Sequence, residues 1–248
     1  MNLFTLAVLV LLLACLVLLF YCAHKIRRVH LQGFKILDAA SREGDVLFAQ
    51  MQALLALERI LKLPEPLPPM RGWAGSPDFL LMVANHISQR KPKVVMECSS
   101  GVSTLVIARS LSLLGAGHVF SLEHDPQYAM KTRDMLAANG VSAWATVIDA
   151  PLVKGAAPSP WYDISGLPPD ASAVELLVVD GPPSHVAPQS RFPALVQLQT
   201  RLAPACTVML DDADRPDERA IVQRWLQQYP EFTCSHLPYE KGLAILAR

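Results

Sequence analysis

The sequence predicts a doubly wound α/β domain with a seven-stranded, mostly parallel sheet and an antiparallel C-terminal hairpin, preceded by one N-terminal transmembrane helix. Three observations lead to this prediction: an uncharged apolar run opens the chain, short β-branched runs then alternate with helical segments, and acidic residues stand where five of those runs end. We expect a transmembrane helix at residues 1–24, a juxtamembrane helical stalk and proline-rich linker at 25–71, and the α/β domain at 72–248.

The N-terminal run from Leu3 to Ala23 contains no charged residue. A helix of this length, rising about 1.5 Å per residue, crosses the roughly 30 Å hydrocarbon layer. No basic residue precedes the run, which favours a retained anchor over a cleaved signal peptide, although removal of the helix stays an alternative. Five basic side chains follow it directly: His24, Lys25, Arg27, Arg28 and His30. The positive-inside rule therefore predicts a single-pass membrane protein whose α/β domain is cytoplasmic.

Apolar residues recur at helical spacing between Leu31 and Leu63, with interruptions at Gly33 and Gly44. Two interpretations of this stalk stay open: a helix packed on the domain, or a helix that pairs with a second copy of the chain in a homodimer. The proline-rich residues 64–69 end the helix, because proline lacks the amide donor and clashes with the preceding turn.

Composition excludes several classes of partner and site. The formal net charge of +0 provides no field that would attract nucleic acid, so we expect no nucleic-acid partner. The five cysteines are odd in number and include no Cys-x-x-Cys pair, which argues against a disulfide framework and a structural zinc site.

The α/β domain follows from alternating strand and helix patterns. Strands are expected at residues 93–96, 118–123, 145–149, 174–180, 207–210, 232–237 and 243–247. Helices are expected at 76–89, 104–114, 126–139, 189–202 and 216–229. This alternation predicts parallel strands with right-handed crossovers, and the short turn at 238–242 predicts an antiparallel hairpin at the sheet edge.

Five acidic residues stand at the carboxyl ends of the expected parallel strands: Glu97, Glu123, Asp149, Asp180 and Asp211. Ligands of such sheets bind beyond the carboxyl ends of the strands, where the strand order reverses. The five acids are therefore expected to converge on one crevice.

The turn from Glu97 to Ser103 is the first candidate binding element. Gly101 lets the backbone approach a ligand closely, and Glu123 follows it by about twenty positions, near the spacing at which an acid accepts hydrogen bonds from a ribose diol. The turn lacks the Gly-x-Gly-x-x-Gly pattern that cradles a pyrophosphate, and Ser99 stands where its first glycine would be. A nucleoside without phosphates fits this combination, and S-adenosylmethionine is the commonest cofactor of that kind.

Four segments together resemble successive motifs of class I S-adenosylmethionine-dependent methyltransferases, which have a Rossmann-like fold: residues 97–103, 121–125, 178–183 and 210–214. The resemblance covers about residues 72–248 and is nearest to the small catechol-O-methyltransferase-like branch, including membrane-anchored bacterial forms. It implies residence in the bacterial inner membrane. It also implies that the turn beginning at Glu97 binds the cofactor, with roles for six residues: Ser99, Gly101 and Ser103 around the methionine part, Glu123 on the ribose, Asp149 near the adenine and Asp180 close to the methyl group.

A hydroxyl acceptor needs a base, and the candidate catalytic residues are Asp180 and His185, with Lys154 as a further candidate. In catechol-type relatives a divalent ion is held by acids that would correspond to Asp180, Asp211 and Asp212, where Asp212 replaces an asparagine. Mg²⁺ is not the favoured interpretation and no metal ligand is assigned, because Asp212 and Asp214 would equally cap the helix beginning at Pro216.

The expected activity is methyl transfer, with O-methylation favoured, to a small-molecule or lipid-like acceptor. Trp161 and Tyr162, in a proline-rich insert at 151–169, would contribute to the acceptor pocket or anchor the insert to the core. The alternatives are a catalytically silent adenosylmethionine-binding or scaffold protein and an aminopropyltransferase-like enzyme.

Overall fold

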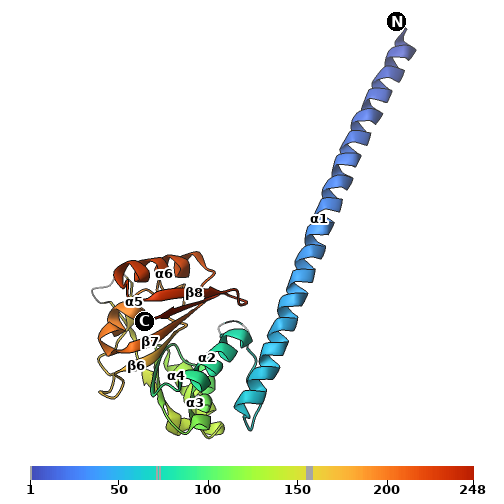
Figure 1. Cartoon of the computed structure of the whole chain (residues 1–248). Coiled ribbons are helices and arrows are strands. Elements are labelled where there is room, and N and C mark those ends of the chain that lie inside the picture. The colour runs from blue at the N-terminus through green and yellow to red at the C-terminus, as the bar shows by residue number, and fades with distance from the viewer. Residues whose placement is uncertain (1, 71, 73, 155–158) are drawn as a thin grey trace. The chain divides into compact units, whose positions relative to one another are not determined.

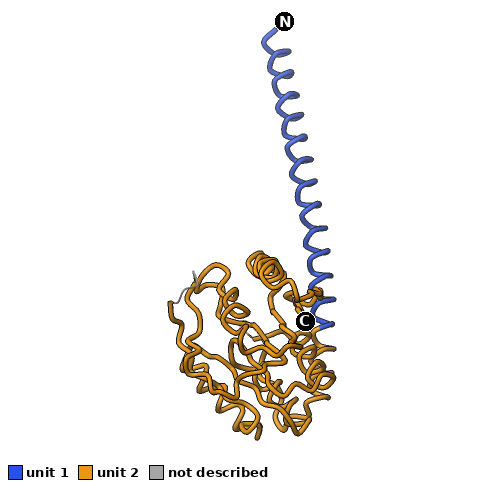
Figure 2. Tube along the Cα trace, turned by 60° about the vertical axis from the view of Figure 1, so that its left-hand side comes forward, with its two compact units in different colours: residues 1–49 blue, residues 50–248 orange. Residues whose placement is uncertain are grey.

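The computed structural model describes the chain except for residues 1, 71, 73 and 155–158. The chain divides into two compact units, residues 1–49 and residues 50–248 (Figure 2). Helix α1 (Leu3–Leu61) begins in the first unit and ends in the second.

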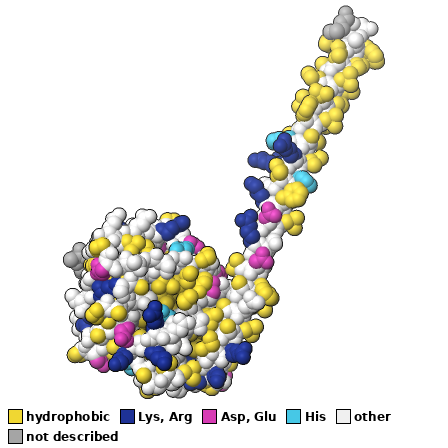
Figure 3. Space-filling view, in the orientation of Figure 1, with side chains coloured by type: hydrophobic (Ala, Val, Ile, Leu, Met, Phe, Trp, Pro, Cys, Tyr) yellow, Lys and Arg dark blue, Asp and Glu magenta, His cyan; other side chains and the backbone are white. Residues whose placement is uncertain are grey.

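Unit 1 is a single continuous helix that runs through Gly33 and Gly44 without a break. Its first part carries exposed leucine, valine and phenylalanine side chains, and lysines and arginines follow them along the helix (Figure 3). Helix α1 is long and apolar enough to cross a membrane by length and composition. The expected N-terminal helix is therefore present.

The end of α1 packs on the α/β domain within the second unit. Leu57 and Leu61 are fully buried in one of its two apolar cores. The Gln50 amide donates to Asp78 Oδ2 at 2.7 Å, and the Arg109 guanidinium donates to the carbonyl of Leu61 at 2.7 Å, which satisfies a backbone acceptor at the helix end. From residue 50 onward, α1 therefore packs on the domain.

A sheet forms the centre of the domain (Figure 1). It has seven strands in the order β3-β2-β1-β6-β7-β9-β8. Its strands are β1 (Val94–Cys98), β2 (His118–Glu123), β3 (Ala145–Asp149), β6 (Val174–Val179), β7 (Leu202–Asp211), β8 (Thr233–Leu237) and β9 (Leu243–Ala247). The first five are parallel, whereas β9 pairs antiparallel with β7 and with β8. The predicted fold class is confirmed. The last strand of the chain, β9, lies between β7 and the edge strand β8.

Helices cover both faces of this sheet. The helices are α2 (Pro77–Arg90), α3 (Val102–Leu114), α4 (Pro126–Ala138), α5 (Pro193–Leu198) and α6 (Pro216–Gln228), with short 3-10 helices at Ser142–Trp144 and Gln199–Arg201. Side chains alternate along each strand, so Val95 joins the core formed with α2, α3 and α4, while Met96 joins the core formed with α5 and α6. Both faces are therefore apolar, as parallel strands require.

Three details of the fold differ from the expectation. The helix expected at 189–202 is shorter, because Gln189 has a positive φ of 50° and the helix starts only at Pro193. Strand β7 begins at Leu202, earlier than expected, and its pairing with β6 shifts register between Val174 and Leu176. The proline-rich insert also forms a small antiparallel pair that the sequence did not predict: β4 (Leu152–Val153) and β5 (Trp161–Tyr162).

Candidate functional site

A cavity of about 260 Å³ opens at the carboxyl ends of the central strands, where the strand order reverses between β1 and β6. Its lining comes from the turns after β1, β2 and β6 and from the insert: Ser99, Ser100, Glu123, His124, Asp125, Tyr128, Tyr162, Asp180, Gly181, Pro183 and His185. Open α/β sheets bind their ligands at this switch point. The cavity therefore defines the candidate site.

The turn after β1 forms one wall, and its backbone is unusual. Ser99 has φ 126° and Gly101 has φ 146°, both in the region that favours glycine. The Ser99 amide still donates to the Leu122 carbonyl at 3.0 Å, which ties the turn to β2. Ser99 thus adopts a backbone conformation that favours glycine, at a cost of about 1–3 kcal/mol in strain.

Gly181 faces this turn across the cavity floor. A Cβ atom at this position would overlap the Tyr162 hydroxyl and would lie 3.2 Å from the Ser99 Cβ. A side chain at position 181 would therefore collide with both walls. The first residue of the Gly-Pro-Pro segment allows β1 and the insert to close on the end of β6.

Glu97 lies behind the turn and is fully buried. Its Oε2 accepts hydrogen bonds from the Thr104 hydroxyl at 2.6 Å and the Ser121 hydroxyl at 2.5 Å, and Thr104 Oγ1 in turn accepts from the Gly101 amide at 3.0 Å. Burial raises the pKa of Glu97 to about 7, although the hydroxyl donors oppose the shift. Through Thr104, Glu97 supports the turn from the interior of the domain. Its other carboxylate oxygen, Oε1, is buried and accepts no hydrogen bond.

Glu123, the last residue of β2, presents its carboxylate to the cavity. The Ser100 hydroxyl donates to Oε2 at 2.8 Å and the Asp125 amide donates to Oε1 at 3.0 Å. His124 Nδ1 also lies 3.1 Å from Oε1. These contacts hold the carboxylate in one orientation and link it to the turn after β1.

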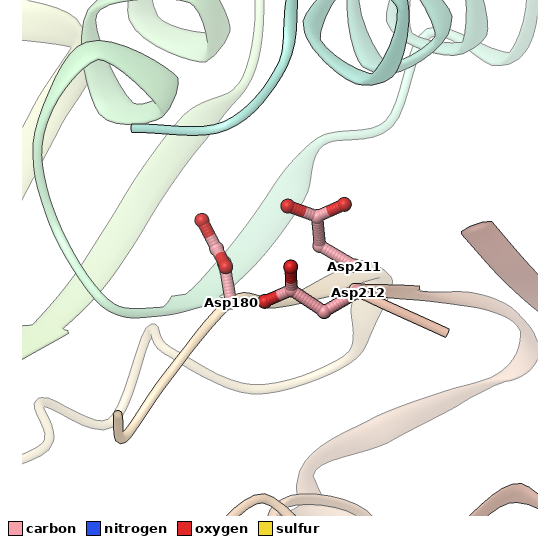
Figure 4. Close-up of side chains that lie close together, drawn as sticks. All are labelled: Asp180, Asp211 and Asp212. Carbon is pink, nitrogen blue, oxygen red and sulfur yellow. The ribbon is translucent and has the colours of Figure 1, made fainter. Parts of the chain in front are cut away.

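Three carboxylates gather beside the cavity on the other half of the edge (Figure 4). Asp180 follows β6, Asp211 ends β7, and Asp212 comes next with φ 59°. One carboxylate oxygen from each of the three residues lies within 4.8 Å of the other two. Burial raises the pKa of Asp180 to about 6 and raises that of Asp211 well above its ordinary value, and the neighbouring carboxylates add to both effects.

A buried arginine contacts this acidic cluster. Arg191 lies between β6 and α5 and is only 3% exposed. Its Nη2 lies 3.2 Å from Asp180 Oδ1 and 2.8 Å from Asp212 Oδ2, and its Nη1 donates to the Asp211 carbonyl at 2.9 Å. Its Nε lies 3.8 Å from Glu218 on α6. The cluster therefore contains its own cation.

The structure brings some sequence-predicted residues together at the cavity and leaves others apart. Ser99, Glu123, Asp180 and His185 line the cavity. Gly101 and Ser103 lie in the turn and the first turn of α3, directly behind the lining residues, as does Glu97.

Two further predicted residues are exposed. Asp149 ends β3, where its carboxylate is 61% exposed and lies 2.9 Å from Arg133. Lys154 is exposed after β4. Neither belongs to the cavity lining.

The roles of three residues in the site were not predicted from the sequence: Ser100, Thr132 and Arg191. Ser100 bonds to Glu123, and the Thr132 hydroxyl lies 3.0 Å from the Ser100 hydroxyl. Arg191 contacts the acidic cluster. Tyr162 and Trp161 are both 3% exposed and belong to the core, and Tyr162 also lines the cavity. Both aromatic side chains therefore anchor the insert to the core, and a role in an acceptor pocket stays a prediction.

The capping interpretation of Asp212 and Asp214 is not supported. The cap of α6 is Arg215, which makes no side-chain capping bond. Asp212 Oδ2 instead contacts Arg191 and Arg215, and Asp214 lies 3.2 Å from His236.

Comparison with known proteins connects this geometry to a family. A protein-family model described as "Methyltransferase domain" matches residues 97–213, a range that contains every residue predicted for the site. No curated protein matches the chain.

Solved structures share the fold at low sequence identity. A methyltransferase from Geobacter sulfurreducens is similar with a TM-score of 0.54 at 15% identity, over 84% of this chain and 97% of that one. The O-methyltransferase TomG from Streptomyces achromogenes, solved in complex with S-adenosylmethionine, gives 0.52 at 17% identity, over 80% and 88%. A Podospora anserina methyltransferase bound to S-adenosylhomocysteine gives 0.52 at 18% identity, over 77% and 86%. Residues 97–213 thus match a methyltransferase domain, and the α/β domain shares its fold with these methyltransferases.

Proposed function

We propose that the domain transfers the methyl group of S-adenosylmethionine to a hydroxyl of a small-molecule or lipid-like acceptor, at the cytoplasmic face of a membrane. The observation that carries the proposal is the cavity between the Ser99–Gly101 turn, Glu123 and Asp180. One wall has the elements expected for a nucleoside without phosphates, and the opposite wall has a buried carboxylate.

The residues present fit this cofactor. The Glu123 carboxylate is 5% exposed, is fixed by Ser100 and the Asp125 amide, and can accept hydrogen bonds from a ribose diol. The buried Oε1 of Glu97 lacks a hydrogen-bond donor, which is consistent with an ammonium group bound near the turn. We assign Ser99, Gly101 and Ser103 to the methionine part and Asp149 to the adenine side.

S-adenosylmethionine supplies a methyl group on a sulfonium, which is transferred by in-line displacement when a nucleophile lies behind it. The chain positions the acceptor, excludes water and takes up the proton. Asp180 is suited to the proton because its pKa of about 6 leaves it ionised at neutral pH yet more basic than an exposed carboxylate. His185, exposed at the cavity rim, is the second candidate base.

The membrane part of the proposal rests on helix α1, its apolar first part and the basic residues that follow. By the positive-inside rule these residues remain in the cytoplasm, and the bacterial inner membrane is the membrane we propose. A reporter that is active only in the cytoplasm, fused after Arg248, should be active. Activity only of a reporter that requires export would contradict this orientation.

Transfer of label from methyl-tritiated cofactor tests the activity. The full chain in detergent is incubated with a bacterial membrane extract, and the labelled product is identified. We expect labelled methyl ether products with the wild type and strong loss of label with Asp180→Asn. A chain that binds the cofactor but labels no fraction of membrane or soluble extract would favour the catalytically silent alternative.

A further inference from the structure

By the resemblance to catechol-type methyltransferases, the acidic cluster of Asp180, Asp211 and Asp212 would correspond to the ligands of a divalent ion, and its geometry allows a test of the fit. A divalent ion such as Mg²⁺ needs oxygen ligands about 2.0–2.1 Å away with free lone pairs. Here Asp180 Oδ1 and Asp212 Oδ2 already accept from Arg191, and Arg215 contacts the same Asp212 oxygen at 2.9 Å. Asp211 Oδ2 and Asp212 Oδ1 are buried without a hydrogen-bond partner, so the fit depends on whether a cation can join Arg191 in the cluster.

Arg191 is also fixed on its other side. Its Nη1 donates to the Asp211 carbonyl, and its Nε faces Glu218, which is 2% exposed. A guanidinium that is 3% exposed and contacts acids from β6, β7 and α6 cannot leave the cluster without breaking several buried contacts at once. A metal ion bound to the three carboxylates would then share a buried site with a fixed positive charge.

We propose that Arg191 takes the place of the divalent ion, so that the cluster binds no metal and the domain works without one. In this arrangement Arg191 is a positioning residue. It neutralises the cluster and holds Asp180 Oδ1, so that the Asp180 carboxylate faces the cavity in a fixed orientation. Arg191 itself is not part of the cavity lining and acts through Asp180.

This inference predicts a gain of function that a merely structural arginine would not produce. Removing the guanidinium frees Asp180 Oδ1, leaves Asp212 Oδ2 in contact with the exposed Arg215, and leaves three acids close together without their buried cation. Arg191→Met, which keeps much of the side-chain volume without the charge, should therefore acquire a Mn²⁺ site that the wild type lacks. Arg191→Lys keeps a charge in the cluster and should not acquire the site.

The experiment is a titration of the full chain in detergent with Mn²⁺ alone, followed by electron paramagnetic resonance, with thermal unfolding measured in parallel. We expect no saturable binding and no Mn²⁺-dependent rise in Tm for the wild type. Arg191→Met should bind one ion per chain and gain Tm with Mn²⁺. Arg215→Met removes the exposed arginine from the same Asp212 oxygen and is the matched control, so it should behave as the wild type.

Saturable Mn²⁺ binding by the wild type that is lost in Asp211→Asn would overturn the proposal, and so would a folded Arg191→Met that binds no Mn²⁺. Where Arg191→Met does not fold, Asp212→Asn replaces it. That variant recreates the Asp-Asn pair of the catechol-type relatives while Arg191 remains, and Mn²⁺ binding by it would contradict the proposal. Binding of S-adenosylmethionine by the same wild-type preparation is measured separately, so failure of the proposed function is distinguished from failure of this inference.

Discussion

The β1–β2 half and the β6–β7 half of the strand-end edge both contain buried acids, but different partners hold them. In the first half, hydroxyl and amide groups hold Glu97 and Glu123. In the second, a buried guanidinium contacts Asp180 and Asp212. Neutral donors leave a carboxylate free to accept from a further neutral ligand, whereas a fixed cation neutralises it and sets its orientation.

This difference separates two tasks on one edge of the sheet. The half held by hydroxyls suits recognition of a nucleoside, whose ribose diol is an uncharged donor. The half held by Arg191 suits a base, Asp180, whose carboxylate must keep its orientation while the acceptor hydroxyl loses its proton. The following variants change one side at a time and leave the other intact.

The largest expected effect is on Arg191. Arg191→Met should lower the free energy of unfolding by about 3–5 kcal/mol, because it leaves buried carboxylates without their cation. Arg215→Met removes a guanidinium from the same Asp212 Oδ2, but its side chain is 45% exposed, so the loss should be about 0–1 kcal/mol. Urea unfolding of the full chain in detergent measures both. Equal losses would show that burial of Arg191 has no special energetic role.

The second effect is a pH dependence on the hydroxyl-held side. Between pH 4.5 and about 7 the folded chain keeps the Glu97 proton that the unfolded chain has lost, so the free energy of unfolding falls as pH rises. Across this window the wild type should lose about 3 kcal/mol relative to Glu97→Gln.

Denaturant unfolding at several pH values tests this effect of Glu97. Asp134→Asn, at an exposed position on α4, is the control and should keep the wild-type profile. Parallel profiles for the wild type and Glu97→Gln would mean that Glu97 is ionised in the folded chain throughout.

The smallest effect concerns Ser99. Ser99→Gly should raise the free energy of unfolding by about 1 kcal/mol, because relief of the strain at φ 126° exceeds the entropy that glycine adds to the unfolded chain. Ser184→Gly, at an exposed position without a positive φ, should lower it by several tenths of a kcal/mol. Melting temperatures of the two variants decide the sign. A destabilised Ser99→Gly would point to a side-chain contact of Ser99 that outweighs its strain.

The sequence predicted the sheet and the acids at its edge because both depend on local patterns. Apolar β-branched runs mark strands buried on both faces, and the residue after each run lies at the carboxyl edge. Glu123 and Asp180 were predicted in this way, and both line the cavity. The same argument does not predict the direction of a side chain. Asp149, at the end of the edge strand β3, was therefore grouped with them although its carboxylate contacts Arg133.

Contacts between distant segments were beyond the sequence argument. Arg191 lies in a segment expected to be helical, and no local pattern connects it to Asp212 or to Glu218. The hydrogen bond from Ser100 to Glu123 likewise joins two turns that meet only in the folded chain. The polar network of the site is set by tertiary packing, whereas the strand ends that present it are set locally.

Calorimetric titration of the full chain with S-adenosylmethionine measures whether the cavity beside Glu123 binds this cofactor. We predict micromolar binding by the wild type, unchanged affinity in Asp134→Ala, and affinity about ten-fold or more weaker in Glu123→Ala, since hydrogen bonds to a carboxylate contribute about 1.5–3 kcal/mol. A folded wild type that binds no S-adenosylmethionine, or a Glu123→Ala variant with wild-type affinity, would contradict the account.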